Sequence, residues 1–221
     1  ELAMPGEVAA SDLKPGAIYN SNRFTLRGLL ENFGCEISDY GIVPDSLDAT
    51  RATLREAARG NDLIITSGGV SVGEEDHIKP AVEAEGRLSM WQIAVKPGKP
   101  LAFGEVRRSN GDDGGASVSS ATGASVSSAT GASVSSATGA AYFLGLPGNP
   151  VSSFVTFLLF VRPFLLRLQG VTGQVEPQGY SVRADFDLPR GDRRNEFLRA
   201  RLNAAGGLDL FPNQSSGVLT S

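Results

Sequence analysis

Apolar residues in the first 170 positions recur with the spacing of amphipathic helices. Leu26, Leu29, Leu30 and Phe33 are spaced i, i+3, i+4, i+7, which puts them on one face of a helix. Ser21 or Asn22 can cap this helix and Gly34 can end it. Further helices are predicted over 47–59, capped by Ser46, over 78–85, and from 150 to 161 as a buried helix that Pro163 kinks or restarts.

Short apolar runs lie between these helices. They cover 35–43, 63–65, 90–95, 101–106 and 141–144. Their length is that of buried strands. Strands that alternate with helices predict an α/β domain with a mostly parallel sheet. In such sheets ligands bind at the carboxyl ends of the strands.

The pattern changes after Gly170. Residues 174–179 are typical of a linker, and Tyr180, Val182, Ala184, Phe186 and Leu188 alternate strictly with other residues, which predicts an amphipathic strand. Residues 196–202 and 208–211 add further β-rich sequence. We therefore divide the chain into an α/β domain over 1–173 and a β-rich segment over 174–221, the latter too short to be an independent domain.

An exact repeat interrupts the α/β pattern between residues 109 and 140. The unit Ala-Ser-Val-Ser-Ser-Ala-Thr-Gly occurs three times, beginning at Ala116, Ala124 and Ala132. Small polar units cannot bury a core, so a solenoid is excluded. We predict a flexible insertion between two strands and assign it no function.

Composition excludes several classes of function. The formal net charge is -4, from 20 Lys and Arg against 24 Asp and Glu, which gives no electrostatic case for nucleic-acid binding. A single Cys excludes an internal disulfide and a multi-cysteine zinc site, and a single His nearly excludes a Ser/His/Asp triad. The first residues lack a signal peptide, and the apolar run 154–161 is too short to span a bilayer. We expect a cytoplasmic protein that does not bind membranes.

A glycine-rich loop follows the apolar run 63–65. Its sequence is Ser67-Gly-Gly-Val-Ser-Val-Gly73, and its exposed N–H and hydroxyl groups could approach an anionic ligand closely. The next residues, Glu74-Glu75-Asp76, could hold Mg²⁺. A tight strand-to-helix turn with an acidic helix N-terminus explains this stretch equally well.

Two further loops carry candidate chemistry. In Lys96-Pro-Gly-Lys-Pro100 two prolines stiffen a turn that projects two lysines, although two such lysines could also be ordinary solvated charges. In Leu146-Pro-Gly-Asn-Pro-Val-Ser152 a Gly/Pro loop leads into a helix N-terminus, which attracts anions. A stiff turn with a helix cap is the structural alternative.

Taken together and in this order, the three loops resemble motifs of the molybdopterin molybdotransferases, which are the MoeA proteins and the E domains of gephyrin. The resemblance implies a three-layer molybdopterin-binding-like α/β domain followed by the start of a β-barrel domain. Relatives open the α/β domain with a strand that ends in Thr-Gly-Asp-Glu-Leu, whereas this sequence starts at Glu1-Leu2. We therefore expect a fragment with its first strand missing and its barrel truncated.

The resemblance also implies a reaction and a site. Such enzymes insert molybdate into adenylylated molybdopterin and release AMP, assisted by Mg²⁺, and the full-length protein is expected to be a homodimer. The implied catalytic residues are Asp76, which also binds the metal, Lys96 and Lys99. Those implied to bind the molybdopterin-AMP or the oxyanion are Ser67, Gly68, Gly69, Ser71, Gly73, Pro147, Gly148, Asn149, Pro150, Ser152, Arg199 and Ser215. Molybdate is a tetrahedral dianion, which requires several converging cationic or N–H donors.

Two other functions fit part of this sequence. The first is a molybdopterin adenylyltransferase of the same α/β fold, but the β-rich tail and the Lys-Pro-Gly-Lys-Pro turn disfavour it. The second is a non-catalytic molybdopterin-binding or scaffold module, a role that gephyrin also has at synapses. Scaffolding would not require the complete set of site motifs.

Overall fold

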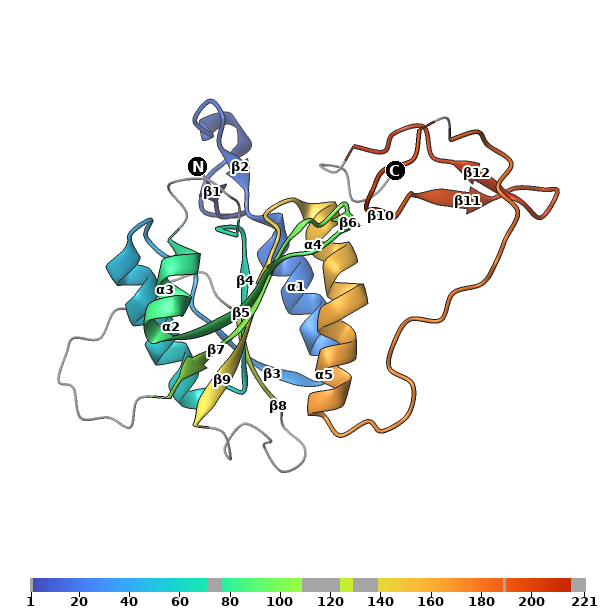
Figure 1. Ribbon diagram of the computed structural model, residues 1–221. Helices are drawn as coiled ribbons and strands as arrows, with labels where there is room; N and C mark the ends of the chain where they lie inside the picture. The colour runs from blue at the N-terminus through green and yellow to red at the C-terminus, as the bar shows by residue number, and fades with distance from the viewer. Residues whose placement is uncertain (1, 71–76, 109–123, 129–138, 189, 216–221) are drawn as a thin grey trace.

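The computed structural model describes residues 2–70, 77–108, 124–128, 139–188 and 190–215, and its centre is a six-stranded sheet (Figure 1). The strand order is β3 (Cys35–Asp39), β8 (Ala124–Ser128), β4 (Leu63–Ser67), β9 (Ala140–Leu146), β7 (Pro100–Arg107) and β5 (Gly86–Gln92). On one face lie α2 (Leu47–Gly60) and α3 (Ile78–Glu85), and on the other α1 (Ser21–Asn32), α4 (Pro150–Thr156) and α5 (Arg162–Leu168). The expected three-layer α/β architecture is confirmed.

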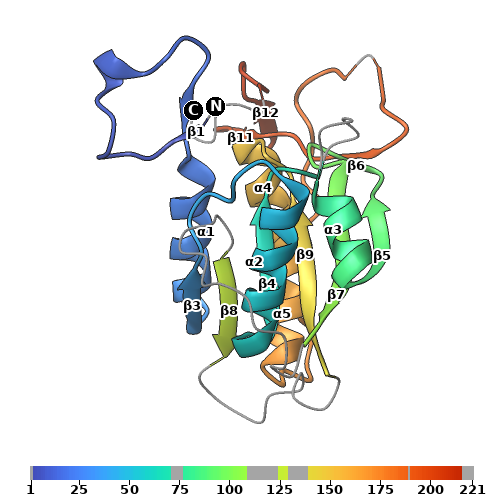
Figure 2. The ribbon, with the colours of Figure 1, turned by 90° about the vertical axis from the view of Figure 1, so that its left-hand side faces the viewer.

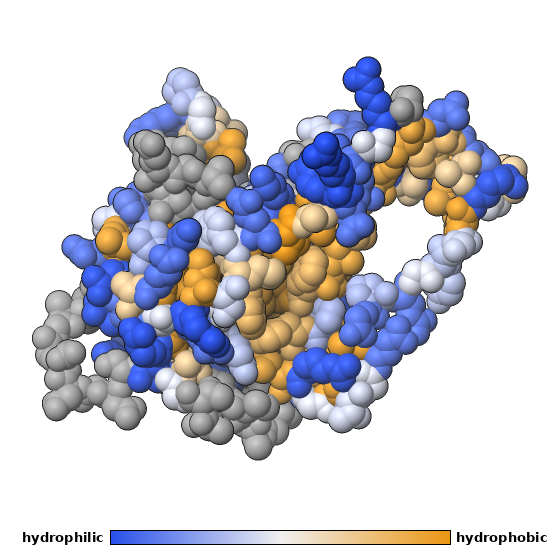
Figure 3. All heavy atoms as spheres, viewed as in Figure 1, coloured by the Kyte–Doolittle hydropathy of each residue, from blue (hydrophilic) through white to orange (hydrophobic). Residues whose placement is uncertain are grey.

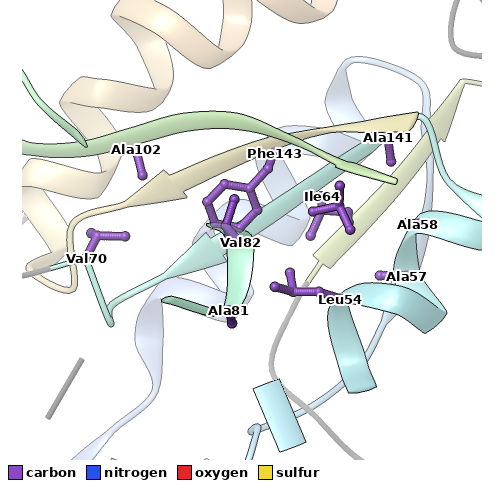
Figure 4. Close-up of a cluster of buried hydrophobic side chains, with 11 residues drawn as sticks. Leu54, Ala57, Ala58, Ile64, Val70, Ala81, Val82, Ala102, Ala141 and Phe143 are labelled. Carbon is purple, nitrogen blue, oxygen red and sulfur yellow. The ribbon is translucent and has the colours of Figure 1, made fainter. Parts of the chain in front are cut away.

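The pleat of the central strands divides the core into two clusters. Leu63 and Ile65 of β4 pack with α1 and α5, while Ile64 between them faces the cluster built from α2 and α3. Phe143 of β9 lies in this second cluster, among Ile64 and Val82 (Figure 4). These side chains are at most 2% exposed. Burial of each such side chain contributes roughly 1.5–3 kcal/mol, so the two apolar faces of the central strands hold the three layers together.

The sheet is mixed, and the prediction of a mostly parallel sheet was wrong. Within the described part of this six-stranded sheet only β4 and β9 pair in parallel, whereas β7 is antiparallel to both β5 and β9. Parallel strands need a crossover connection of about a dozen residues or more. Residues 93–99 between β5 and β7 are too few for that and contain only the short strand β6 (Val95–Lys96), so these strands form an antiparallel pair.

The repeat supplies a strand to the interior of the sheet. Residues 124–128, at the start of its second copy, form β8, which pairs antiparallel with both β3 and β4 (Figure 2). The prediction of a wholly flexible insertion over 109–140 was therefore wrong for these residues, because a neighbouring strand on each side provides backbone partners that outweigh the weak strand preference of serine. The flanking copies lie outside the described residues.

The helix starts follow the expected capping chemistry with one shift. Asn20 caps α1, since its side chain accepts a hydrogen bond from the N–H of Arg23, so the cap is neither Ser21 nor Asn22. Ser46 caps α2 as predicted. Asn149 caps α4, with Pro150 in the first turn, where its missing N–H costs nothing.

The last helical stretch runs through α4, a π-helical turn η3 (Phe157–Val161) and α5. Pro163 lies in the first turn of α5, in agreement with the prediction that the helix restarts there. The continuous helix Pro150–Leu168 has a mean hydropathy of 1.7 and is long and apolar enough to cross a membrane, so the estimate of a run too short to do so was wrong. One side, with Phe157, packs into the core, and 39% of its most apolar window is buried. Figure 3 shows an apolar surface over α4 and α5.

The ends of the chain carry short elements. The N-terminal segment contains β1 (Leu2–Ala3), the 3₁₀ turn η1 (Ala10–Asp12) and β2 (Ile18–Tyr19), and the tail contains β10 (Asn195–Glu196), β11 (Ala200–Leu202) and β12 (Leu208–Leu210). The alternating residues 180–188 form no strand in the described chain: Ala184 makes one isolated bridge to Leu208 and Tyr180 is 85% exposed. The segment meets β12 only at this bridge, so the alternating pattern did not lead to a paired strand here. The division at 173/174 and the barrel remain predictions.

Candidate functional site

The glycine-rich loop and the Pro-Gly-Asn-Pro loop lie side by side. They follow β4 and β9, and because these strands are parallel neighbours, both loops leave the same edge of the sheet. The N–H of Gly68 donates to the carbonyl of Leu146 at 3.0 Å. Gly68 has φ +87°, and a Cβ on Gly148 would lie 3.4 Å from the Cα of Gly68. The glycines therefore permit a close approach of two backbones.

Asn22 fastens these loops to α1. Its Nδ2 donates to Ser67 Oγ at 2.7 Å and to the carbonyl of Gly148 at 2.8 Å, and the residue is only 8% exposed. The sequence reasoning gave Asn22 no role beyond capping. A signal was present, since Asn22, Leu26 and Leu30 are spaced by four and share the buried face of α1.

The lysine turn packs against the start of α4. A Cβ on Gly98 would lie 2.7 Å from Thr156 Cγ2, and Gly98 has φ +122°, so glycine is needed here for both space and backbone conformation. The Lys96–Pro97 peptide bond is cis. In the first turn of α4, the N–H of Ser152 donates to Asn149 Oδ1 at 3.2 Å. The turn thus packs along α4, with Gly98 close to Ser152 and Thr156.

A cavity of about 520 Å³ opens between the lysine turn, α4 and the tail. Its polar lining includes Lys96, Lys99, Ser152, Arg194, Glu196 and Arg199. The tail reaches the turn because β10 pairs with β6 in parallel, with Glu196 opposite Lys96. Four cationic side chains from two distant parts of the sequence thus surround one cavity, and its size is that of ordinary small-molecule sites.

Two carboxylates hold two of the four cations. Lys96 Nζ lies 2.7 Å from Glu196 Oε1 and 3.6 Å from Asp192 Oδ2, and the hydrogen bond to Glu196 raises the pKa of Lys96. Arg194 donates to both oxygens of Asp192, at 2.7 and 3.0 Å. These bonds lower the pKa of Asp192 far below its ordinary value. Lys96 and Arg194 therefore stay cationic at neutral pH.

The other two cations differ from each other. Arg199 donates through Nη2 to the carbonyls of Asn213 and Ser215, at 2.5 and 2.9 Å, so part of its guanidinium closes a turn of the tail. For Lys99, no ion pair is found within the described parts of the chain. Lys99 is thus the cation of the cavity most available to a bound anion.

The predicted site residues fall into four groups. Lys96, Lys99, Ser152 and Arg199 line the cavity. Ser67, Gly68, Gly69, Pro147, Gly148, Asn149 and Pro150 belong to the paired loops or the adjoining helix start. Ser71, Gly73 and Asp76 lie outside the described residues, and Ser215 contacts Arg199 through its carbonyl without lining the cavity.

Arg194, Glu196 and Asp192 were missed. The sequence indicated only that Glu196 begins a β-rich stretch over 196–202 and gave Asp192 and Arg194 no role. The dense charges of Asp192-Arg-Arg-Asn-Glu196 next to an apolar strand were the available signal, but only the pairing of β10 with β6 reveals that these charges meet the lysine turn.

No metal site is visible in the described chain. Within it, no three His, Cys, Asp or Glu side chains cluster closely enough to hold an ion. The acidic residues 74–76 are not among the described positions. The four cationic side chains that line the cavity make it a candidate site for an anion.

Comparison with known families identifies the α/β part. The family described as "Probable molybdopterin binding domain" matches residues 6–167. The chain belongs to the molybdopterin-binding domain family. Its matched region contains the three loop motifs, whereas Arg194, Glu196 and Arg199 lie beyond it.

Relatives of this molybdopterin-binding domain carry related names. A molybdopterin molybdenumtransferase of Haemophilus influenzae is 37% identical over 187 residues, which cover 85% of this chain and 38% of that relative. Gephyrin of Dictyostelium discoideum is 46% identical over 170 residues, which cover 73% of this chain and 21% of gephyrin. The chain thus spans less than two fifths of the length of either relative.

A solved structure supports the same assignment. The crystal structure of the molybdopterin biosynthesis MoeA protein from Pyrococcus horikosii matches with a TM-score of 0.55 and 27% identity, over 78% of this chain and 34% of that one. The resemblance to the MoeA and gephyrin family, inferred from three ordered loops, is confirmed by these relatives.

Proposed function

We propose that the full-length protein is a molybdopterin molybdenumtransferase, which inserts molybdate into adenylylated molybdopterin and releases AMP. The observation that carries this proposal is the cavity where the lysine turn and the tail bring Lys96, Lys99 and Arg194 together. Relatives named for this activity or for molybdenum cofactor synthesis support it. A binding-only module would not need several cations around one cavity.

Each part of the site has a role in this proposal. Lys99 and Lys96 bind molybdate, aided by Ser152 at the start of α4, whose N-terminus favours a negative charge. The loops after β4 and β9, which Asn22 joins, bind the phosphate-bearing pterin. The adenylyltransferase alternative leaves the cations contributed by the tail without a role.

The proposal for Mg²⁺ rests on the sequence alone. Carboxylate oxygens are the ligands that Mg²⁺ prefers, and Glu74, Glu75 and Asp76 follow the glycine-rich loop directly. We propose Asp76 as the metal ligand. A homodimer, expected from the family resemblance, and a cytoplasmic location, expected from the composition, belong to the same proposal for the full-length protein.

Calorimetric titration of molybdate into the chain tests the cavity. Lys99→Ala removes a cation for which the described chain shows no ion pair, so it should leave folding unchanged and weaken molybdate binding about 10-fold, because a hydrogen bond to a charged group contributes about 1.5 kcal/mol or more. Lys79→Ala is the matched control. Lys79 belongs to α3, its ammonium lies over the ring of Trp91 on β5, and it lines no part of the cavity. Equal molybdate affinities in the two variants would contradict the proposal.

A further inference from the structure

The cavity contains a carboxylate where an oxyanion would bind. Glu196 lies opposite Lys96 in the β6–β10 pair, and its Oε1 is 2.7 Å from Lys96 Nζ. Backbone hydrogen bonds on both sides fix this register: the N–H of Asn195 donates to Ala94, and that of Phe197 to Lys96. The Glu196 side chain is 17% exposed, against 44% for Lys96. The carboxylate is therefore held in place by the backbone, while the ammonium extends toward solvent.

Without Glu196 the charged side chains at the cavity sum to +3, more positive charge than a dianion needs to be neutralised. Lys96, Lys99, Arg194 and Arg199 are cationic, and Asp192 is bound to Arg194 by two hydrogen bonds. Glu196 adds a second negative charge and occupies the donor groups of Lys96. An oxyanion that enters the cavity must share the Lys96 ammonium with the Glu196 carboxylate. The negative charge of this carboxylate also repels the oxyanion.

We infer that Glu196 is a positioning residue with two effects: it holds Lys96 in the cavity and it competes with the bound oxyanion for the ammonium, thereby limiting oxyanion affinity. This inference rests on the proposed function of the cavity as the molybdate site. It assigns to the tail a direct influence on a lysine of the molybdopterin-binding domain. Release of the oxyanion is favoured because the Glu196 carboxylate replaces the oxyanion as the partner of the Lys96 ammonium.

Two tetrahedral anions of the same shape and different charge test this role. Molybdate is a dianion at neutral pH and perrhenate is a monoanion. Glu196→Gln keeps a hydrogen-bond acceptor for Lys96 and removes the charge. Coulomb energy is proportional to the charge of the ligand. If the variant strengthens perrhenate binding n-fold, it should therefore strengthen molybdate binding about n²-fold, for example about 3-fold and about 10-fold at moderate ionic strength.

The measurement is calorimetry on the whole chain with both anions, with Glu105→Gln as the control. Glu105 pairs with Arg87 on β5 and β7 and does not line the cavity, so its substitution should change neither affinity. Equal fold-changes for the two anions in Glu196→Gln would indicate a structural role only and overturn the inference, as would unchanged or weaker binding. Absence of molybdate binding by the unsubstituted chain would overturn the proposed site as well.

Discussion

At the scale of single residues, the site depends on polar side chains that connect loops. Asn22 joins α1 to the loops after β4 and β9, and Glu196 joins the tail to the lysine turn. Neither residue belongs to the loop motifs that led to the family. The residue types of those motifs were readable from the sequence, whereas these connecting partners depend on which strands are neighbours.

Asn22→Ala should destabilise the fold by about 1–3 kcal/mol, because two hydrogen bonds from a buried side chain, to Ser67 and to the carbonyl of Gly148, are lost. Asn32→Ala, at the exposed end of the same helix, is the control and should change stability by no more than about 0.5 kcal/mol. Urea denaturation measures both. Equal losses in the two variants would show that the bridge between the loops contributes nothing.

At the scale of elements, much of the fold was predictable. Apolar spacing gave α1, α2, α3 and the central strands, because their burial follows directly from period and length. The predicted parallel direction was wrong for β7, because the connection from β5 is too short for a crossover. The prediction of a strand was wrong for residues 180–188, which alternate without forming one. The repeat was misjudged because Ser-rich sequence carries little intrinsic signal, and the position between β3 and β4 determines its structure.

The strand from the repeat gives a prediction with two internal controls. Val126→Pro removes a backbone donor within β8, which is paired on both sides, and should cost about 1–3 kcal/mol of stability. Val118→Pro and Val134→Pro make the identical change in the first and third copies. Thermal unfolding should distinguish Val126→Pro from the other two. If all three variants unfold at the same temperature, β8 is not specific to the second copy.

At the scale of the whole molecule, the site exists only where the tail meets the α/β domain. The sequence alone could place the lysine turn at an edge of the sheet but could not predict the pairing of β10 with β6, because two-residue strands carry no periodicity. The cavity and three of its charged residues follow from that single contact between distant parts of the sequence.

Attachment of the tail should depend on pH. Arg194 and, to a smaller extent, Lys96 of the lysine turn, 3.6 Å from Asp192, lower the pKa of Asp192, so the folded state, in which the tail meets this turn, favours the carboxylate. The ionised Asp192 contributes fully to the stability of the folded state above the unfolded pKa of about 3.9. This stabilisation is lost as the pH falls toward the lower pKa of the folded state. Limited proteolysis across this range should show faster cleavage of the tail at low pH. Asp192→Asn should abolish that dependence, while Asp187→Asn, an exposed change in the same tail, should preserve it.

The central claim is that the cavity between the lysine turn, α4 and the tail binds the oxyanion. The most direct test is a crystal of the chain soaked in molybdate, with diffraction data collected on both sides of the molybdenum absorption edge. We predict an anomalous peak in the cavity, within hydrogen-bond distance of Lys99 and Lys96 and beside Ser152. A peak at the loops after β4 and β9 with the cavity empty, or no peak at saturating molybdate, would contradict the account.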